Sequence, residues 1–254
     1  PRPRQALIHV QADPDELGRV YQADVAVNAA PTRFAAALRH VLPLDGSAWR
    51  GELEQARADY LANLRHLPLP GTLDMGEVMA ELRRTLPDDA ILTNGAGNFA
   101  VWAHRFYEFR RYGTQIAPTS GAMGYGVPAA VGAKILHPER TVVAFAGDGD
   151  FQMTGQELAT AVQHEANVVV LVVDNGMYGT IRMHQERTYP GRVVGTQLVN
   201  PDFAAYARSF GAYGEAVERT EDFPAALGRA LEAGVPALLE LRVDPEALTP
   251  RQSL

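Results

Sequence analysis

Two continuous apolar runs are the clearest pattern in this sequence. The stretches Thr141–Asp150 (TVVAFAGDGD) and Val168–Gly176 (VVVLVVDNG) stay apolar and largely β-branched until each stops at Asp, Asn and Gly. Continuous runs of this kind predict strands that are buried on both faces of a parallel sheet. A helix is expected between them, because Thr154 and Glu157 have the spacing of a capping box and an apolar stripe at helical spacing follows. The segment therefore predicts a β-α-β unit.

Weaker periodic segments extend this unit into an α/β fold. From residue 71 onward, strands and helices alternate, which predicts a doubly wound, mainly parallel sheet with helices on both faces. The further strands are expected at Ala6–Gln11, Val25–Asn28, Ala90–Asn94 and Val235–Val243, and the further helices at Phe34–Val41, Trp49–Arg65, Thr72–Leu86 with Thr72 as its cap, Phe99–Phe106, Met123–Leu136, Pro201–Phe210 and Asp222–Ala233.

The segments before residue 71 predict a different organisation. A sheet needs several strands to bury its faces, and the two strands expected there have too few partners. Residues 1–42 are therefore interpreted as the C-terminal tail of a domain, and residues 43–70, which end in Pro-Leu-Pro, as a linker. Residues 71–243 form the main predicted domain, and residues 244–254 a polar tail.

Composition favours a globular cytoplasmic enzyme. Apolar residues make up 46% of the 254 residues, and the net charge of −7 argues against nucleic acids and anionic membranes as partners. The absence of cysteine excludes disulfides, thiolate nucleophiles and cysteine-ligated metals. No apolar run reaches the roughly 18 residues of a membrane span.

Polar side chains follow both motif strands, at the edge of the sheet where open α/β folds bind ligands. Asp148 offers a carboxylate and Asn175 an amide carbonyl. Mg²⁺ takes about six oxygen ligands and usually shares them with substrate phosphates. Gly147 and Gly149 allow a ligand to approach the backbone closely, and the N-terminus of the next helix favours anionic oxygens. The pattern therefore predicts a site for magnesium and a diphosphate.

The same residues carry a resemblance to a known family. Gly147–Gly149 followed by Asp174-Asn175 resembles the GDG…NN signature of thiamine diphosphate enzymes. Residues 121–130 (GAMGYGVPAA) and 97–103 (GNFAVWA) are similar to that family's GTMGFGLPAA and GQHQMWA segments. The chain resembles acetolactate synthase large subunits and related 2-oxo acid decarboxylases and carboligases from about Ala6 to about Val243, and residues 1–42 then correspond to the end of a Rossmann-like central domain.

The resemblance implies roles for the matching residues. Asp148, the Asn175 side chain and the Met177 carbonyl would bind Mg²⁺. Met123 would lie under the thiamine diphosphate and hold it in a bent shape, with its 4′-amino group close to the thiazolium C2. The implied cofactor-binding residues, mostly through backbone groups, are Gly97, Asn98, Gly121, Met123, Gly149, Asp150, Tyr178 and Gly179.

Three departures from the family pattern bear on the acetolactate synthase assignment. Asp174 replaces the first Asn of the NN pair, so only Asn175 can serve as the amide ligand. Asp150 stands where relatives often have Ser, and its carboxylate is expected to point away from the diphosphate or toward the water shell of the metal. Asn98-Phe99 replaces a Gln-His pair, of which only Asn98 can donate a hydrogen bond.

For the whole enzyme, the resemblance implies decarboxylation of a small 2-oxo acid, with or without joining of the resulting enamine to a second carbonyl. It also implies a homodimer or homotetramer with the active site at the subunit interface, and it allows FAD in the full-length enzyme. The catalytic glutamate of relatives comes from the partner's pyrimidine-binding domain, and no stretch of this chain resembles that domain. We therefore expect the chain alone to be inactive.

Three alternatives stay open at this point. A simple 2-oxo acid decarboxylase or a hydroxyketone lyase of the same family would keep the same motifs, and Arg182 is then a candidate for recognising a substrate carboxylate or else a surface arginine. A non-catalytic thiamine diphosphate module would also keep them. A nucleotide-binding Rossmann domain fits less well, because Phe151 and Gln152 stand where its third glycine is expected.

Overall fold

A computed structural model describes residues 1–41, 43–65, 67–250 and 252–253 as two compact units. The first unit, Pro1–Asp59, contains two parallel strands, β1 (Ile8–Gln11) and β2 (Val25–Asn28), in which Ile8 lies opposite Val25. The helix α1 (Pro31–Leu38) and two short 3₁₀ turns at Pro14–Glu16 and Ser47–Trp49 complete it. The division between the units, after Asp59, falls within the helix α2 (Arg50–Asn63).

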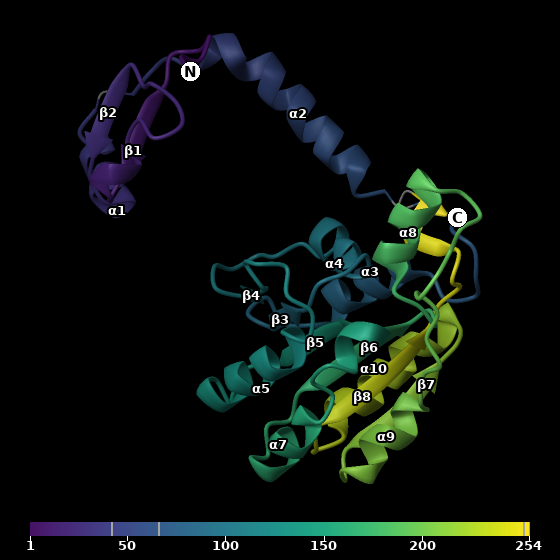
Figure 1. Cartoon of the computed structure of the whole chain (residues 1–254). Coiled ribbons are helices and arrows are strands. Elements are labelled where there is room, and N and C mark those ends of the chain that lie inside the picture. The colour runs from purple at the N-terminus through teal and green to yellow at the C-terminus, as the bar shows by residue number, and fades with distance from the viewer. Residues whose placement is uncertain (42, 66, 251, 254) are drawn as a thin grey trace. The chain divides into compact units, whose positions relative to one another are not determined.

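The second unit, Tyr60–Leu254, is built on a six-stranded sheet in which every neighbouring pair is parallel. The strand order is β4-β3-β5-β6-β8-β7 (Figure 1). The strands are β3 (Ile91–Asn94), β4 (Gln115–Ile116), β5 (Val142–Gly147), β6 (Val169–Asp174), β7 (Tyr213–Val217) and β8 (Ala237–Arg242). The helices are α3 (Met75–Thr85), α4 (Ala100–Phe106), α5 (Gly126–Leu136), α6 (Asp148–Phe151), α7 (Glu157–Gln163), α8 (Gly179–Thr188), α9 (Phe203–Ser209) and α10 (Phe223–Glu232), with a 3₁₀ turn at Thr220–Asp222.

The core lies on both faces of this sheet, as the continuous apolar runs predict. In β5, Val143 and Phe145 pack into a cluster with α3, α4 and α10, whereas Ala144 and Ala146 pack into a second cluster with α5, α7 and α9. All four side chains are fully buried. Alternate residues of one strand therefore hold two helical layers on the sheet, which confirms the predicted doubly wound α/β fold.

Two edge strands and the C-terminal hairpin escaped the sequence analysis. β4 has only two residues, and β7 (YGEAV) lacks the apolar run of the central strands, so neither has a strong strand pattern. Beyond β8, the strand β9 (Ala247–Thr249) pairs antiparallel with β10 (Gln252–Ser253) in the segment expected to be a plain polar tail.

Both predicted helix caps were wrong. The Thr154 hydroxyl donates to the Gly124 carbonyl at 2.8 Å instead of capping a helix, and the chain turns before α7 begins at Glu157. The Thr72 hydroxyl likewise donates to the Glu218 carbonyl, and Asp74 caps α3 by accepting from the backbone N–H of Gly76. In each case the threonine hydroxyl donates a hydrogen bond to a backbone carbonyl that is distant in the sequence, although the local spacing predicted a helix cap.

The predicted domain boundaries at residues 42, 70 and 243 stay predictions, as does the Rossmann-like ancestry of the first unit. Residue 42 itself, residue 66 of the predicted linker, and residues 251 and 254 of the predicted tail lie outside the described residues. Throughout the described parts of the chain, each helix is too short or too polar to cross a membrane.

Candidate active site

The candidate site lies at the carboxyl edge of the large sheet, where the strand order reverses. From β3 the chain goes to β4 on one side and then returns to β5 on the other, so the β3 and β5 ends flank a switch point of the kind where open α/β sheets bind ligands. Gly147 of β5 lies opposite Val173 of β6. The next residues, Asp148 and Asp174, therefore emerge at adjacent strand ends, with Asn175 immediately after.

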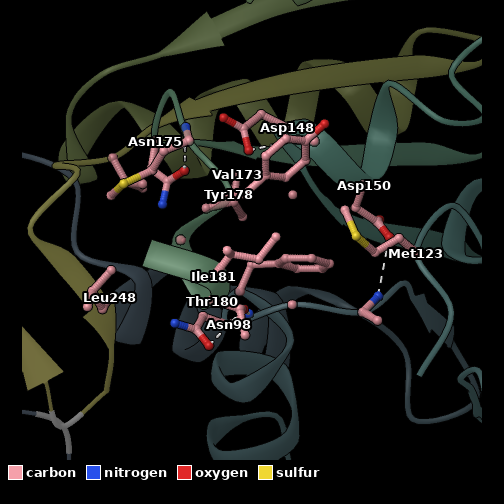
Figure 2. Close-up of a pocket in the computed structure, with 18 of the residues that line it drawn as sticks. Asn98, Met123, Asp148, Asp150, Val173, Asn175, Tyr178, Thr180, Ile181 and Leu248 are labelled. Carbon is pink, nitrogen blue, oxygen red and sulfur yellow. Dashed lines mark hydrogen bonds between the residues drawn. The ribbon is translucent and has the colours of Figure 1, made fainter. Parts of the chain in front are cut away.

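A cavity of about 250 Å³ opens at this edge. Figure 2 shows Asp148 and Asn175 along one side of it, with Met123 at another and Tyr178 between. The cavity brings together every residue for which the resemblance implies a cofactor or metal role, namely Gly97, Asn98, Gly121, Met123, Asp148, Gly149, Asp150, Asn175, Met177, Tyr178 and Gly179. Four separate segments converge on one space, although their individual roles stay predictions.

Asp148 is buried, with only 3% of its surface exposed. Its carboxylate accepts hydrogen bonds from the Gly149 backbone N–H at 2.8 Å and from the Asn200 amide at 2.8 Å. Burial and, to a smaller extent, the nearby Asp174 carboxylate raise the pKa of Asp148, and the two hydrogen bonds lower it. Together these effects bring its pKa to about 6. The negative charge of this buried carboxylate is therefore only partly stabilised by its two N–H donors.

Asn175 and Met177 form a tight turn beside this carboxylate. The Asn175 side-chain oxygen accepts from the Met177 backbone N–H at 3.2 Å, and the Met177 carbonyl accepts from Gly179 N–H at 2.9 Å. Met177 also forms an isolated β-bridge with Gln197. These contacts fix the amide oxygen and the backbone carbonyl on the wall that Asp148 occupies.

Close packing explains the glycines of the G-D-G motif. A Cβ atom at Gly149 would lie 2.4 Å from the Tyr178 ring, and one at Gly147 would lie 2.6 Å from the Phe99 ring. Phe99 in turn packs edge-on against Phe145, with ring centroids 5.6 Å apart. Only glycine therefore lets the backbone of this turn approach the cavity walls so closely.

Asp150 connects three segments of the site. It is 2% exposed, and its Oδ1 accepts from the backbone N–H of Gly124 at 2.8 Å and of Ala96 at 3.2 Å. Burial raises the pKa of Asp150 to about 6, against the lowering effect of these two N–H groups. The side chain thus holds the turn after Met123 and the loop after β3 against α6.

Asn98 is joined across the cavity to α8. The Thr180 hydroxyl accepts from the Asn98 backbone N–H and donates to the Asn98 side-chain oxygen, both at 2.9 Å. Within the described part of the chain, the Asn98 amide nitrogen faces just one acceptor, the sulfur of Met183 at 3.7 Å. Sulfur is a weak acceptor, so this amide keeps a donor that a phosphate oxygen could use.

The resemblance implies that backbone N–H groups near Gly149, Asp150, Tyr178 and Gly179 hold phosphate oxygens. Three of these four groups already have acceptors within the chain. Gly149 N–H donates to Asp148, Tyr178 N–H to the Thr196 carbonyl at 2.8 Å, and Gly179 N–H to the Met177 carbonyl. A phosphate at this site would have to share or replace these bonds, and the assignment of these groups stays a prediction.

Sequence reasoning missed the apolar part of the cavity wall. Ile181 of α8 lies beside Thr180, and Val243, Ala247 and Leu248 enter from the C-terminal segment. The segment after Pro245 (EALTP) has no periodic pattern that could have marked the last two. Arg182, the candidate for recognising a substrate, is absent from the described residues that line the cavity, and its guanidinium contacts the Met177 sulfur at 3.5 Å.

Comparison with known protein families identifies the same region. The family described as "Thiamine pyrophosphate enzyme, C-terminal TPP binding domain" matches residues 95–241. This segment contains the three motifs on which the resemblance rests and most of the cavity. The match confirms the predicted resemblance.

Individual relatives extend over nearly the whole chain. The chain is 31% identical to the acetolactate synthase isozyme 2 large subunit of Escherichia coli K12 over 245 residues, which cover 95% of this chain and 44% of that protein. It is 31% identical to the mitochondrial acetolactate synthase catalytic subunit of Saccharomyces cerevisiae (95% and 36%) and 34% identical to the acetolactate synthase of Mycobacterium leprae (90% and 38%). The chain thus spans about two fifths of the length of these curated relatives.

The raised pKa of Asp150 predicts a pH-dependent stability. An aspartate whose pKa rises from 3.8 unfolded to about 6 folded binds its proton more tightly in the folded state, so its contribution to folding is present below pH 4 and is lost as the pH rises through 6. In Asp150→Asn this titration is removed. Between pH 4 and pH 8, the free energy of unfolding of the variant should therefore gain on wild type by at most about 3 kcal/mol. Urea denaturation at both pH values measures the difference, and parallel pH profiles would show that Asp150 titrates normally.

Proposed function

Because the chain belongs to the thiamine pyrophosphate enzymes, whose C-terminal cofactor-binding domain matches more than half of it, we propose that its cavity holds thiamine diphosphate through Mg²⁺ in an acetolactate synthase-like enzyme. The whole enzyme would decarboxylate a 2-oxo acid and join the product to a second carbonyl. The names of the relatives support this reading. A simple 2-oxo acid decarboxylase or hydroxyketone lyase is the second candidate, since the cavity wall lacks a cationic group among its described residues that would favour one acceptor.

The observation that carries the proposal is the donor set on one cavity wall. Asp148 offers a carboxylate oxygen, Asn175 an amide oxygen and Met177 a backbone carbonyl, and all three line the cavity. Hard cations such as Mg²⁺ prefer these oxygen ligands and complete their shell with phosphate and water. Among the described residues no three His, Cys, Asp or Glu side chains gather as a site for another metal. The residues present therefore fit Mg²⁺ bound together with a diphosphate.

The other residues that line the cavity would orient the cofactor and exclude water from it. Thiamine diphosphate, when bound, supplies a thiazolium carbon that attacks the carbonyl of a 2-oxo acid. Met123 lines the cavity at the turn that Asp150 holds in place, where its side chain could support the cofactor from below. Val173, Ile181 and Leu248 give the cavity apolar walls that exclude water from the reacting centre.

A further acid would have to come from another polypeptide segment. Among the described residues, Asp148 and Asp150 are the only acids that line the cavity, and the first is the proposed metal ligand while the second is bound to two backbone N–H groups. Ile181 lines the cavity yet is 50% exposed, as expected for an apolar surface that a partner covers. A homodimer or homotetramer with a shared active site would supply the further acid and would cover the exposed side chain. FAD stays an expectation from the resemblance alone.

The metal assignment is tested by removing its charged ligand. Asp148→Ala should show no measurable Mg²⁺-dependent binding of thiamine diphosphate, because Mg²⁺ tolerates little loss of charge or geometry. Isothermal calorimetry with and without Mg²⁺ measures the binding. The matched control is Asp88→Ala, which removes a half-exposed acid outside the cavity that pairs with Arg83 and Arg110. Equal affinity of wild type and the Asp148 variant would end the cofactor assignment.

The role of Met123 is tested by a different readout. Met123→Ala should bind the cofactor with a modest loss, yet slow proton exchange at the thiazolium C2, because misplacing reacting groups by ~1 Å can cost ~100-fold in rate. Exchange is followed by NMR in the protein together with its pyrimidine-binding partner domain. Met153→Ala is the control, since Met153 is 49% exposed. Unchanged exchange in the Met123 variant would refute the positional role.

The need for a further acid predicts that residues 1–254 alone release no CO₂ from pyruvate at a rate typical of enzymes, ~1–10³ s⁻¹. Adding the pyrimidine-binding domain of the same enzyme should restore turnover. A coupled assay of CO₂ release compares the two preparations. Rapid turnover by residues 1–254 without that domain would mean that the acid lies within this chain.

A further inference from the structure

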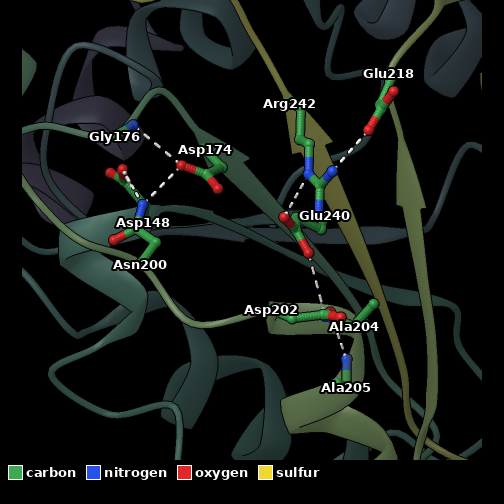
Figure 3. A network of polar contacts seen from close by, with 10 residues as sticks. All are labelled: Asp148, Asp174, Gly176, Asn200, Asp202, Ala204, Ala205, Glu218, Glu240 and Arg242. Carbon is green, nitrogen blue, oxygen red and sulfur yellow. Dashed lines mark hydrogen bonds and ion pairs between the residues drawn. The ribbon is translucent and has the colours of Figure 1, made fainter.

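Asn200 forms a bridge behind the wall of the cavity that holds Asp148. Its amide nitrogen donates to Asp148 Oδ2 at 2.8 Å and to Asp174 Oδ1 at 2.7 Å, as Figure 3 shows. The bridge spans the ends of two neighbouring strands, β5 and β6. Neither Asn200 nor Asp174 is among the described residues that line the cavity. Neither side chain therefore contacts a ligand in the cavity directly.

The direction of the Asn200 amide is fixed by the two acids. Because carboxylate oxygens accept hydrogen bonds, the NH₂ group faces Asp148 and Asp174, and Asn200 Oδ1 at the other end accepts from Gln152 Nε2 at 2.8 Å. Asp174 Oδ1 also accepts from the Gly176 backbone N–H at 3.0 Å. Each hydrogen bond of the bridge thus has one sensible donor and one sensible acceptor, and flipping the amide would place its oxygen against two carboxylates.

The bridge holds two like charges at one edge of the sheet. Asp148 is nearly inaccessible to solvent, and carboxylates that share such a region repel each other more strongly than they do in water. The two N–H groups of a neutral amide compensate part of this charge. A divalent cation on the cavity side of Asp148 would compensate much more of it, and the bridge keeps the carboxylate from rotating out of reach.

We propose that Asn200 is a positioning residue that holds Asp148 for the cation, and that Asp174, bound to the same amide, raises the cation affinity of the site by its charge. This inference rests on the proposed cation–diphosphate function. Residues that hydrogen-bond metal-ligating carboxylates commonly change metal affinity by about 10–100-fold when they are replaced. Asn200 thus contributes to the cation affinity through its hydrogen bond, and Asp174 contributes through its charge.

The test uses Mn²⁺ as the probe, at pH 8 and with thiamine diphosphate present, because the EPR signal of free Mn²⁺ gives the affinity directly. Asn200→Ala should weaken Mn²⁺ binding by about 10–100-fold. Asp174→Asn keeps an oxygen that can accept from Asn200 and Gly176, and it should weaken binding by a smaller factor through the lost charge. The matched control is Asn167→Ala, whose amide donates to the Gly234 carbonyl near the opposite ends of β6 and β8.

Thermal unfolding gives a second readout that a purely structural role would not produce. Without cation, Asp174→Asn should melt higher than wild type, because one of two repelling carboxylates is gone. With saturating Mn²⁺, its rise in melting temperature should be smaller than that of wild type, since a weaker ligand stabilises less. A higher melting temperature without cation together with a smaller rise on adding Mn²⁺ indicates a charge effect on the cation. General loosening of the fold would lower the melting temperature in both conditions.

The outcomes are separable. Wild-type Mn²⁺ affinity in both Asn200→Ala and Asp174→Asn would overturn the inference while leaving the proposed function intact. Loss of affinity in Asn167→Ala equal to that in Asn200→Ala would also overturn it. If wild type takes up no Mn²⁺ with thiamine diphosphate, the proposed function fails, and the inference fails with it.

Discussion

The parallel pairing of β5 and β6 is the constraint on which the rest of the site depends. Both strands are buried on both faces, so polar groups can emerge only where the strands end. Because Gly147 and Val173 lie opposite each other, the acids that follow them must end up side by side. This placement concentrates negative charge at a low-dielectric edge, and the surrounding structure serves largely to hold that charge in place.

The loops around the cavity are joined by polar side chains that are buried or half-buried. Asp150 joins the turn near Gly124 to the loop at Ala96, and Asn98 with Thr180 joins that loop to α8. Buried polar groups need partners, so each of these side chains fixes the segments that satisfy it. The cavity is consequently shaped before any ligand enters, which limits the ordering that binding would require.

The sequence predicted the centre of this architecture better than its margins. The motif strands were recognisable because burial on both faces demands unbroken apolar runs, and the ligand edge followed from where those runs stop. The edge strands β4, which has only two residues, and β7, which is more polar, do not need an unbroken apolar run, so the sequence did not mark them. Asn200 could not be found, because it reaches Asp148 across 52 residues from a segment without periodicity. The Thr154 capping box was wrong for a related reason, since its hydroxyl found a distant carbonyl.

Asp148, Asn175 and Met177 are proposed to face one cation that carries a diphosphate. This arrangement is tested most directly by a crystal structure of the protein with Mn²⁺ and thiamine diphosphate, using the anomalous scattering of manganese. We expect one anomalous peak within about 2.0–2.4 Å of oxygens from all three residues, with diphosphate density beside it. Manganese elsewhere, or diphosphate density away from these three residues, would contradict it.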